Sequence, residues 1–308
     1  MQIRGQFSDF FFETMLPALN AKIWQNFKAK KPLATRLVNH DSTSRSIEQF
    51  SQMTGVGLPT LIGETEDVPV DNFVQGFNKT FRPVKYGLGI AASQELVEDD
   101  KVGIISRRSV ALSNSIYQAR EIQAASIYNN AFDGVNFPLP DGQALCAAAH
   151  PLVKSGGTQN NLLSVAADLD VGSLELALTD WELIKTHEGF LQMLPKPSVL
   201  VAAQNRWNVA EILKSQMRSD TANNTRNAFQ DNENGGTIDS IVWSYLTDGD
   251  AWFLVAPAAE TETLWLDRKQ PYTKADYVEK NETGFVYMRY RATYGAYGWR
   301  GVYGTPGY

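Results

Sequence analysis

The sequence has very few of the residues that form covalent links or bind metals. It contains one cysteine, Cys146, and three histidines, His40, His150 and His187, among 308 residues. A single cysteine excludes a disulfide within the chain, which fits a reducing compartment. These four scattered residues also cannot supply the closely spaced ligands of a structural zinc site. We therefore expect a fold that depends on its own core, with no metal and no cofactor.

Long apolar runs are missing too. Runs such as Val199–Ala203 have the length of a strand, far below the roughly 18 residues that a transmembrane helix needs. Near the N-terminus, Asp9 and Glu13 enclose the apolar cluster Phe10–Phe12, which is too short for a signal peptide. The sequence thus predicts a soluble protein that is not secreted by that route.

There is also no excess of positive charge. The chain has 28 basic and 34 acidic residues, a formal charge of −6, so the protein as a whole is no electrostatic match for nucleic acid. Its 43% hydrophobic and 20% charged residues are typical of globular proteins. Its length allows one large domain or two smaller ones.

Among the features that the sequence does contain, the most informative is the segment from Ser93 to Ala131, which has no proline. We predict a helix of some thirty residues, roughly 45 Å long at about 1.5 Å per residue. It should begin near Asp100, because carboxylates favour the positive end of a helix dipole and can cap free N–H groups. The carboxylates at this start belong to Glu95, Glu98, Asp99 and Asp100.

Counting about 100° per residue places the apolar side chains of this helix on one side. Arg107 and Glu121 lie opposite, where they should meet solvent or a partner. We expect the apolar side to pack on a sheet formed partly by residues 287–294. That side carries Ile105, Leu112, Ile116, Ala119 and Ile127.

Residues 1–46 carry seven basic and three acidic residues and show little periodicity. We interpret them as an extended arm. A short helix with Pro17 near its start is the alternative, since four apolar residues could share one of its faces. They are Phe12, Leu16, Leu19 and Ile23.

Residues 47–80 have the opposite charge, with five acidic residues and one lysine. Turn residues interrupt alternating stretches such as Val68, Val70 and Phe73, which predicts a long two-stranded hairpin. An isolated hairpin is only marginally stable in water. This hairpin, which is acidic and poor in core residues, should need another surface to lie on.

Beyond the long helix, the order of predicted elements is that of an α+β protein without βαβ repeats. Asp170 or Ser173 can cap a second helix that ends at Gly189, with Leu174, Leu178, Trp181 and Ile184 on one face. Other predicted elements are loop 132–161, strand Ser198–Ala202, helix Asn205–Gln216, a mobile loop Arg218–Gly236, strands Ser240–Tyr245 and Trp252–Ala256, and strands near Leu264 and at Phe285–Tyr294.

Two patterns imitate enzyme sites. Gly87, Gly89 and Ala92 match a dinucleotide fingerprint, but Arg82 and Pro83 precede them instead of a buried strand, so we interpret the glycines as part of a strand or turn. Cys146 and His150 lie near Asp141 in a loop. Catalytic Cys-His partners normally converge from distant segments, so His150 is better explained as a turn residue with a local hydrogen bond.

The C-terminal segment interleaves aromatic residues with Arg289, Arg291 and Arg300, which superficially suggests stacking on nucleic acid. Alternation along a strand explains the pattern better. In that arrangement the arginines can face the side opposite some of the aromatic rings, or pair across subunits. The aromatic residues are Tyr287, Tyr290, Tyr294, Tyr297 and Trp299.

Four segments together resemble the major capsid proteins of tailed bacteriophages, in particular the Mu-like head proteins. The acidic SQELVEDD turn from Ser93 is similar to the entry of their spine helix, and AAAHPL at 147–152 to a His-Pro turn after it. SVLVAAQNRWNVAEILKS at 198–215 resembles the strand and helix of their axial domain. WRGVYG at 299–304 resembles their C-terminal strand.

The resemblance implies the HK97-like α+β fold, with five segments along the chain. It also implies a structural, non-enzymatic subunit that assembles with itself into hexamers and pentamers of an icosahedral head around double-stranded DNA. Portal and scaffold proteins would be partners, with or without a decoration protein. Assembly would take place in the host cytoplasm, and DNA would be held without specific binding. The segments are the N-terminal arm 1–46, the E-loop hairpin 47–90, the peripheral domain with the spine helix 91–190, the axial domain 191–256 and the return strands 257–308.

An encapsulin-like nanocompartment shell, which shares this fold, is the alternative. In the head, we expect the acidic hairpin to lie across a neighbouring subunit and to meet Arg107 and Arg108 of its spine helix. The acidic residues are Glu64, Glu66, Asp67 and Asp71. Residues 54–78 contain no lysine, so the covalent crosslinking known in one branch of the family is not expected.

Overall fold

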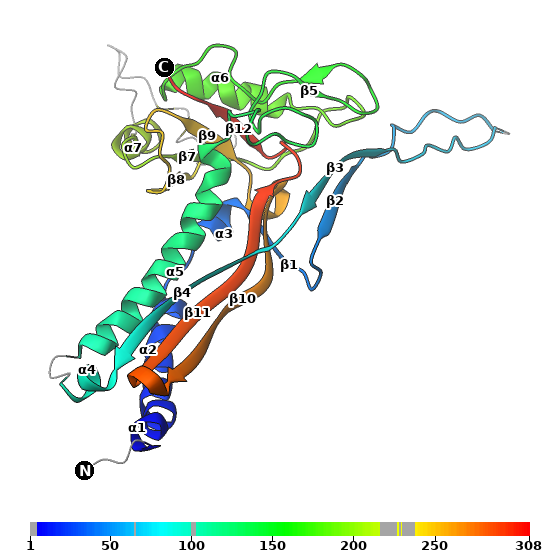
Figure 1. The fold of residues 1–308 in the computed structure, drawn as a ribbon. Coiled ribbons are helices and arrows are strands. Elements are labelled where there is room, and N and C mark those ends of the chain that lie inside the picture. Colours follow the sequence, from blue (N-terminus) through cyan, green and yellow to red (C-terminus); the bar gives the residue numbers. More distant parts are fainter. Residues whose placement is uncertain (1–4, 65, 100–102, 216–226, 228, 230–237) are drawn as a thin grey trace.

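The computed structural model describes residues 5–64, 66–99, 103–215, 227, 229 and 238–308. Two four-stranded sheets dominate it, and a long helix, α5 (Ile104–Asn129), runs along one and ends at the other (Figure 1). The long sheet has the order β1-β10-β11-β4, and the short sheet has the order β12-β9-β7-β8. The predicted α+β class is therefore confirmed.

The long sheet is built on a pair of extended strands. β10 (Thr263–Val278) and β11 (Thr283–Ala296) are antiparallel, β4 (Val84–Ser93) pairs with β11, and β1 (Asn39–Ser42) runs parallel to β10. Burial alternates along β11, with even-numbered residues from Val286 to Ala292 inside. This alternation confirms the interpretation of the aromatic and basic C-terminal segment as a strand.

Helix α5 begins later than its acidic entry predicted. Ser93 caps a separate short helix, α4 (Gln94–Glu98), by accepting a hydrogen bond from the Leu96 N–H at 3.3 Å. Gly103, with φ of 69°, then precedes the first turn of α5. Only glycine adopts this left-handed conformation at little cost, which suits it to the position just before α5. The predicted start near Asp100 is therefore wrong, and α5 has 26 residues.

The apolar side of α5 packs as predicted in its first half. Ile105, Leu112 and Ile116 are buried against the even-numbered side chains of β11. The prediction for Glu121 is wrong, because this residue is 1% exposed and accepts a hydrogen bond from Trp243 Nε1 at 2.8 Å. In the second half of α5 the buried face is wider, so a polar residue there needs a buried partner.

The N-terminal segment is helical rather than extended, so the arm predicted for residues 1–46 is wrong in conformation. α1 (Gly5–Phe10), a π-helical segment η1 (Phe11–Met15) and α2 (Leu16–Ala29) follow one another without a break. Pro17 lies in the first turn of α2, directly after the π-helical segment. Leu19 and Ile23 pack in the core with α5, whereas Phe12 is exposed and Phe11 is buried in its place.

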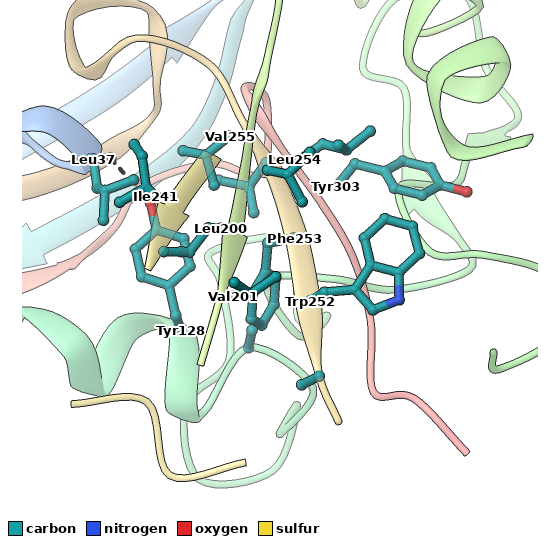
Figure 2. Close-up of a cluster of buried hydrophobic side chains, with 14 of the residues drawn as sticks. Leu37, Tyr128, Leu200, Val201, Ile241, Trp252, Phe253, Leu254, Val255 and Tyr303 are labelled. Carbon is teal, nitrogen blue, oxygen red and sulfur yellow. Dashed lines mark hydrogen bonds between the residues drawn. The ribbon is translucent and has the colours of Figure 1, made fainter. Parts of the chain in front are cut away.

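The short sheet forms a second core around the end of α5 (Figure 2). Tyr128 of α5 enters this core and donates a hydrogen bond from its hydroxyl to the Leu37 carbonyl at 3.0 Å. Every residue of the central strands is almost fully buried apart from Ser198. The elements are α3 (Ala34–Leu37), α6 (Val171–Glu182), β7 (Ser198–Val201), α7 (Arg206–Lys214), β8 (Ser240–Val242), β9 (Trp252–Val255) and β12 (Val302–Thr305).

Two predicted boundaries need correction here. β12 pairs with β9, so the end of segment 257–308 belongs to the short sheet and not with β10 and β11. Helix α6 ends at Glu182 rather than Gly189. Its start was predicted correctly, and both candidate residues take part, since Asp170 and Ser173 form a reciprocal capping box.

The hairpin is paired only at its root. β2 (Glu48–Met53) and β3 (Gln75–Phe81) are antiparallel, but residues 54–74 contain no strand in the part that the structure describes. The strand predicted around Val68, Val70 and Phe73 is therefore wrong. Nor does the hairpin extend to residue 90, because β4 leaves it to join the long sheet.

The remaining elements are short. β5 (His150–Pro151) and β6 (Thr158–Gln159) form a small projecting turn, and η3 (Ala258–Glu260) and η4 (Glu279–Asn281) are single 3₁₀ turns. The predicted mobile loop Arg218–Gly236 lies almost entirely outside the described residues. Among the helices that are described, none combines the length and apolar content needed to cross a membrane.

Candidate functional site

Residues 54–74, here called the hairpin loop, extend well away from the rest of the molecule (Figure 1). The loop is unusually apolar for an exposed segment: Leu61 is 100% and Val70 is 86% exposed. With no strand pairing and no core beneath them, these side chains bury little surface within the subunit. The other exposed apolar residues at and near the loop are Met53, Val56, Leu58, Ile62, Val68, Phe73 and Val74.

The same loop is purely acidic in its charge. Glu64, Glu66 and Asp67 are exposed, and no lysine or arginine occurs between Arg45 and Lys79. The Glu66 carboxylate accepts a hydrogen bond from the Gly63 N–H at 3.0 Å, which closes the tip. The loop therefore presents carboxylates and apolar side chains side by side.

Asp71 differs from the other three acidic residues because it already has a cationic partner in its own chain. Its Oδ2 lies 2.5 Å from Lys154 Nζ and accepts the Gly57 N–H at 2.7 Å. These contacts, above all the one with Lys154, hold the pKa of Asp71 below its usual range. Asp71 thus has a role within the subunit, whatever it contacts outside.

Arg107 and Arg108, the partners expected from the sequence, lie in the first turns of α5. Arg107 is exposed, and Arg108 donates a hydrogen bond to the Ala91 carbonyl of β4 at 3.4 Å. This end of α5 and the hairpin loop are at opposite ends of the molecule (Figure 1). A contact between the two sets of residues would therefore join different subunits.

A second cationic surface was not recognised from the sequence. One face of the long sheet is covered by α2 and α5, while the opposite face carries the odd-numbered residues of β11. There Tyr287 stacks on Phe285 at 6.0 Å, and the Arg289 guanidinium lies 4.9 Å from the Tyr287 ring centre. The strand register adds lysines from both neighbouring strands. This basic sheet face comprises Lys85, Lys269, Lys274, Arg289 and Arg291.

None of these five cations forms an ion pair with a carboxylate among the described residues, and Asp276 is the acidic residue that shares their face. Gly87 and Gly89, the residues of the apparent dinucleotide fingerprint, lie in β4 beneath Arg289 and Tyr287. A side chain at Gly89 would collide with the Tyr287 ring. The alternation in 285–291 could have revealed the face, but only the pairing with β4 and β10 brings the lysines to it.

The root of the hairpin is held by a small aromatic cluster and by hydrogen bonds from Gln52 and Lys79. Phe50 packs against Phe81 and Tyr297, with ring centres 5.6 and 5.5 Å away. Gln52 donates a hydrogen bond to the Tyr297 carbonyl at 3.0 Å, and Lys79 donates to the Pro138 carbonyl at 2.8 Å. Burial lowers the pKa of the Lys79 ammonium.

Beside this root is a polar pocket of about 330 Å³ lined by His187, Glu262 and Arg300, among others. Both ring nitrogens of His187 face N–H groups: Val153 N at 3.3 Å and an Arg300 guanidinium nitrogen at 2.9 Å. Burial, followed by the nearby Arg300 charge, lowers the pKa of His187 to about 4. Burial raises the pKa of Glu262.

The apparent Cys-His-Asp set is structural. His150 is fully buried, bonds Asp141 Oδ2 at 2.7 Å and Asn161 Oδ1 at 3.0 Å, and stacks on Trp299. Burial raises the pKa of the Cys146 thiol, which opposes formation of a nucleophilic thiolate. Within the described residues, no group of three or more His, Cys, Asp or Glu side chains is arranged to hold a metal.

Comparisons with known proteins agree with this architecture. Residues 78–305 match the model of a family described as phage capsid protein. A structure from Microbacterium phage Oxtober96 has a TM-score of 0.54 and 10% identity, covering 90% of this chain and 91% of its own. The capsid of cyanophage P-SCSP1u gives 0.58 and 9%, with 90% and 88% covered.

A virus-like particle from Pyrococcus furiosus is also similar, with a TM-score of 0.55, 7% identity, and 94% and 98% of the two chains covered. At such low identity these likenesses show the fold alone. Comparison with curated proteins found no significant match.

Proposed function

The chain belongs to the phage capsid protein family and has the HK97-like fold, and from this premise we propose how its subunits build a shell. It is a structural major capsid protein. The family match favours a phage head over the encapsulin-like nanocompartment. Our proposal concerns the contacts: the hairpin loop lies across a neighbouring subunit, and repetition of this contact closes hexamers and pentamers into an icosahedral head.

The observation that carries this proposal is the exposure of the loop. Apolar side chains from Met53 to Val74 lie in water in the single subunit, although burying one such side chain is worth roughly 1.5–3 kcal/mol. Large exposed apolar patches mark surfaces for other proteins. A second copy of the chain is the partner that a shell supplies at every position.

The acidic residues of the loop call for a cationic surface on that neighbour. Arg107 and Arg108, predicted from the sequence, are one candidate. The basic sheet face is the other, and it offers aromatic rings for the apolar loop residues as well as positive charge for Glu64, Glu66 and Asp67. Each exposed ion pair contributes only about 0–1 kcal/mol, so many repeated pairs are needed.

The names of the segments, the enclosed DNA, the other partners and the place of assembly are part of the same proposal. The arm name applies to residues 1–46, which include α2, the E-loop name to residues 47–83, and the peripheral name to the rest of the long sheet with α5. The axial name applies to the short sheet with α7 and with α6, which was predicted in the peripheral segment 91–190 but packs in the core of the short sheet. The shell encloses double-stranded DNA without specific binding and works with portal and scaffold proteins, with or without a decoration protein. The subunits assemble in the host cytoplasm and end in the virion.

Electron microscopy of the purified chain tests the proposal. Wild-type protein should give closed icosahedral shells, with scaffold protein added if the chain alone does not assemble. Replacing Glu64, Glu66 and Asp67 together by lysine should block shell formation while the subunits stay folded. Normal particle yield from this triple variant would contradict a role for the acidic loop.

Charge reversals on the neighbouring subunit identify the surface that binds the acidic loop. Reversing Arg107 and Arg108 to glutamate in the triple-lysine background should restore shells if the helix start is the partner. Reversing Arg289 and Arg291 should do so if the basic sheet face is the partner. Recovery in neither background would contradict both contacts.

A further inference from the structure

The direction in which the hairpin projects depends on few contacts. At its root, Gln52 donates to the Tyr297 carbonyl at 3.0 Å and to Glu262 Oε2 at 3.4 Å, and Lys79 donates to the Pro138 carbonyl at 2.8 Å. A polar pocket of about 330 Å³ adjoins β2. Farther along, Lys154 contacts Asp71 and Asn72 of the loop. A contact at a distance from the root, here called the tether, restrains the angle of the projecting hairpin better than a contact at the root itself. Asp71 is four residues before β3, about 13 Å at about 3.3 Å per residue if extended.

The Asp71 carboxylate joins both arms of the loop to this tether. Its Oδ2 accepts from the Gly57 N–H at 2.7 Å and lies 2.5 Å from Lys154 Nζ, while Oδ1 accepts from the Asn72 N–H at 2.8 Å. Lys154 also donates to the Asn72 carbonyl at 3.4 Å. The Asp71 carboxylate therefore contacts Gly57, in the segment that leaves β2, and Asn72, in the segment that leads into β3. The same carboxylate binds the Lys154 ammonium.

Lys154 itself is mounted on a well-defined turn between β5 and β6. The Lys154 and Ser155 N–H groups both donate to the His187 carbonyl, at 3.2 and 2.9 Å, and Leu152 N–H donates to the Gly157 carbonyl at 3.1 Å. Gly156 and Gly157 have φ of 72° and 78°, a conformation that suits glycine. The ammonium is thus carried by a turn that is fixed to the body of the subunit.

From these contacts we infer that Lys154 is a positioning residue: through Asp71 it sets the angle at which the hairpin loop projects toward the neighbouring copy. The inference rests on the proposed shell function. Loss of the tether leaves the apolar and acidic loop residues intact but lets the loop sample other angles. Subunits would then meet their neighbours in the wrong geometry, and regular shells would become rarer.

Spin labels on unassembled subunits test the angle directly, without any need for shells. Labels at Leu61→Cys and Glu182→Cys report the distance from the loop tip to α6, and the buried Cys146 is not expected to react. Lys154→Ala should broaden the distance distribution, and Lys154→Arg, which keeps the cation, should preserve it. An unchanged distribution in Lys154→Ala would overturn the inference.

Shell assembly provides the second readout. Lys154→Ala should lower the fraction of chains in shells of wild-type diameter several-fold, with no change in the unfolding midpoint. The exchange of the two charges, Lys154→Asp with Asp71→Lys, should recover part of the lost shell yield. Lys196→Ala, at an exposed lysine for which no ion pair is seen among the described residues, is the control. Equal yields from Lys154→Ala and Lys196→Ala would overturn the inference. A lower unfolding midpoint in Lys154→Ala would do so too, because it would indicate a purely structural role. Wild-type subunits that show a narrow label distance yet never form shells would contradict the proposed function alone.

Discussion

The short sheet and the hairpin loop are both rich in apolar residues, but they use them in opposite ways. In the strands β7 and β9, residues from Val199 to Val201 and from Trp252 to Val255 are at most 2% exposed (Figure 2). In the loop, Leu61 and Val70 are 86% or more exposed. The first set stabilises the single subunit. The second set can contribute only when another molecule covers it, so subunit stability and assembly depend on different residues.

The largest effect on the subunit is expected where a buried charge loses its partner. Asp267 is 2% exposed and accepts hydrogen bonds from Arg120 at 2.6 Å and from Trp265 Nε1 at 3.1 Å, and its Oδ2 lies 3.0 Å from His40 Nε2. Arg120→Ala should lower the free energy of unfolding by about 3–5 kcal/mol, because it leaves a buried carboxylate poorly compensated. Chemical denaturation of unassembled subunits measures this.

The matched control replaces both partners, as Arg120→Met with Asp267→Leu, which removes the buried charge altogether. This double variant should lose less free energy than Arg120→Ala alone. If the single variant were as stable as wild type, the pair would have no structural role.

A smaller effect is expected for the apolar side of α5. Leu112 is 2% exposed in the core with β11, so Leu112→Ala should cost about 2–5 kcal/mol of unfolding free energy through lost burial and a cavity. Capsid yield should fall with it. Arg107→Ala, on the exposed side of the same helix, should leave the denaturation midpoint unchanged and affect only contacts between subunits. Equal midpoints for both variants would contradict the assignment of the helical faces.

The smallest effect concerns pH at the hairpin root. Because the folded state holds the pKa of His187 at about 4, below the ordinary value of 6.5, the unfolded chain binds a proton first as pH falls. His187 should therefore reduce stability progressively from about pH 6.5 to pH 4. Glu262, whose pKa is raised by burial, has the opposite trend.

Comparing thermal midpoints of wild type and His187→Gln between pH 7 and pH 4.5 isolates the histidine contribution. The midpoint of the variant should fall less over this range. A steeper fall in the variant would show that His187 binds its proton more readily in the folded state than in the unfolded chain.

The sequence predicted the elements that depend on local patterns. The capping box of Asp170 and Ser173, the strand at Ser198 and the apolar side of α5 near Leu112 follow from periodicity and capping chemistry. Prediction from the sequence failed where contacts between distant residues determine which side chains are buried. Glu121 is buried because Trp243, far away in sequence, supplies its hydrogen bond.

Helix α2 was predicted only as the alternative to an extended arm, because its apolar residues pack only once α5 lies beside them. The candidate interface was predicted in part. The acidic loop is visible in the sequence, since its charge is local. The basic sheet face is not, because Lys85, Lys274 and Arg289 come together only through the register of three strands.

The separation of subunit stability from assembly is tested most directly on the loop itself. A double variant, Leu61→Ser with Val70→Ser, removes two highly exposed apolar side chains from it. Its unfolding free energy should stay within about 0.5 kcal/mol of wild type, as for other surface changes, while shells seen by electron microscopy should be largely lost. Shells at the wild-type yield, or a subunit clearly less stable than wild type, would contradict the account.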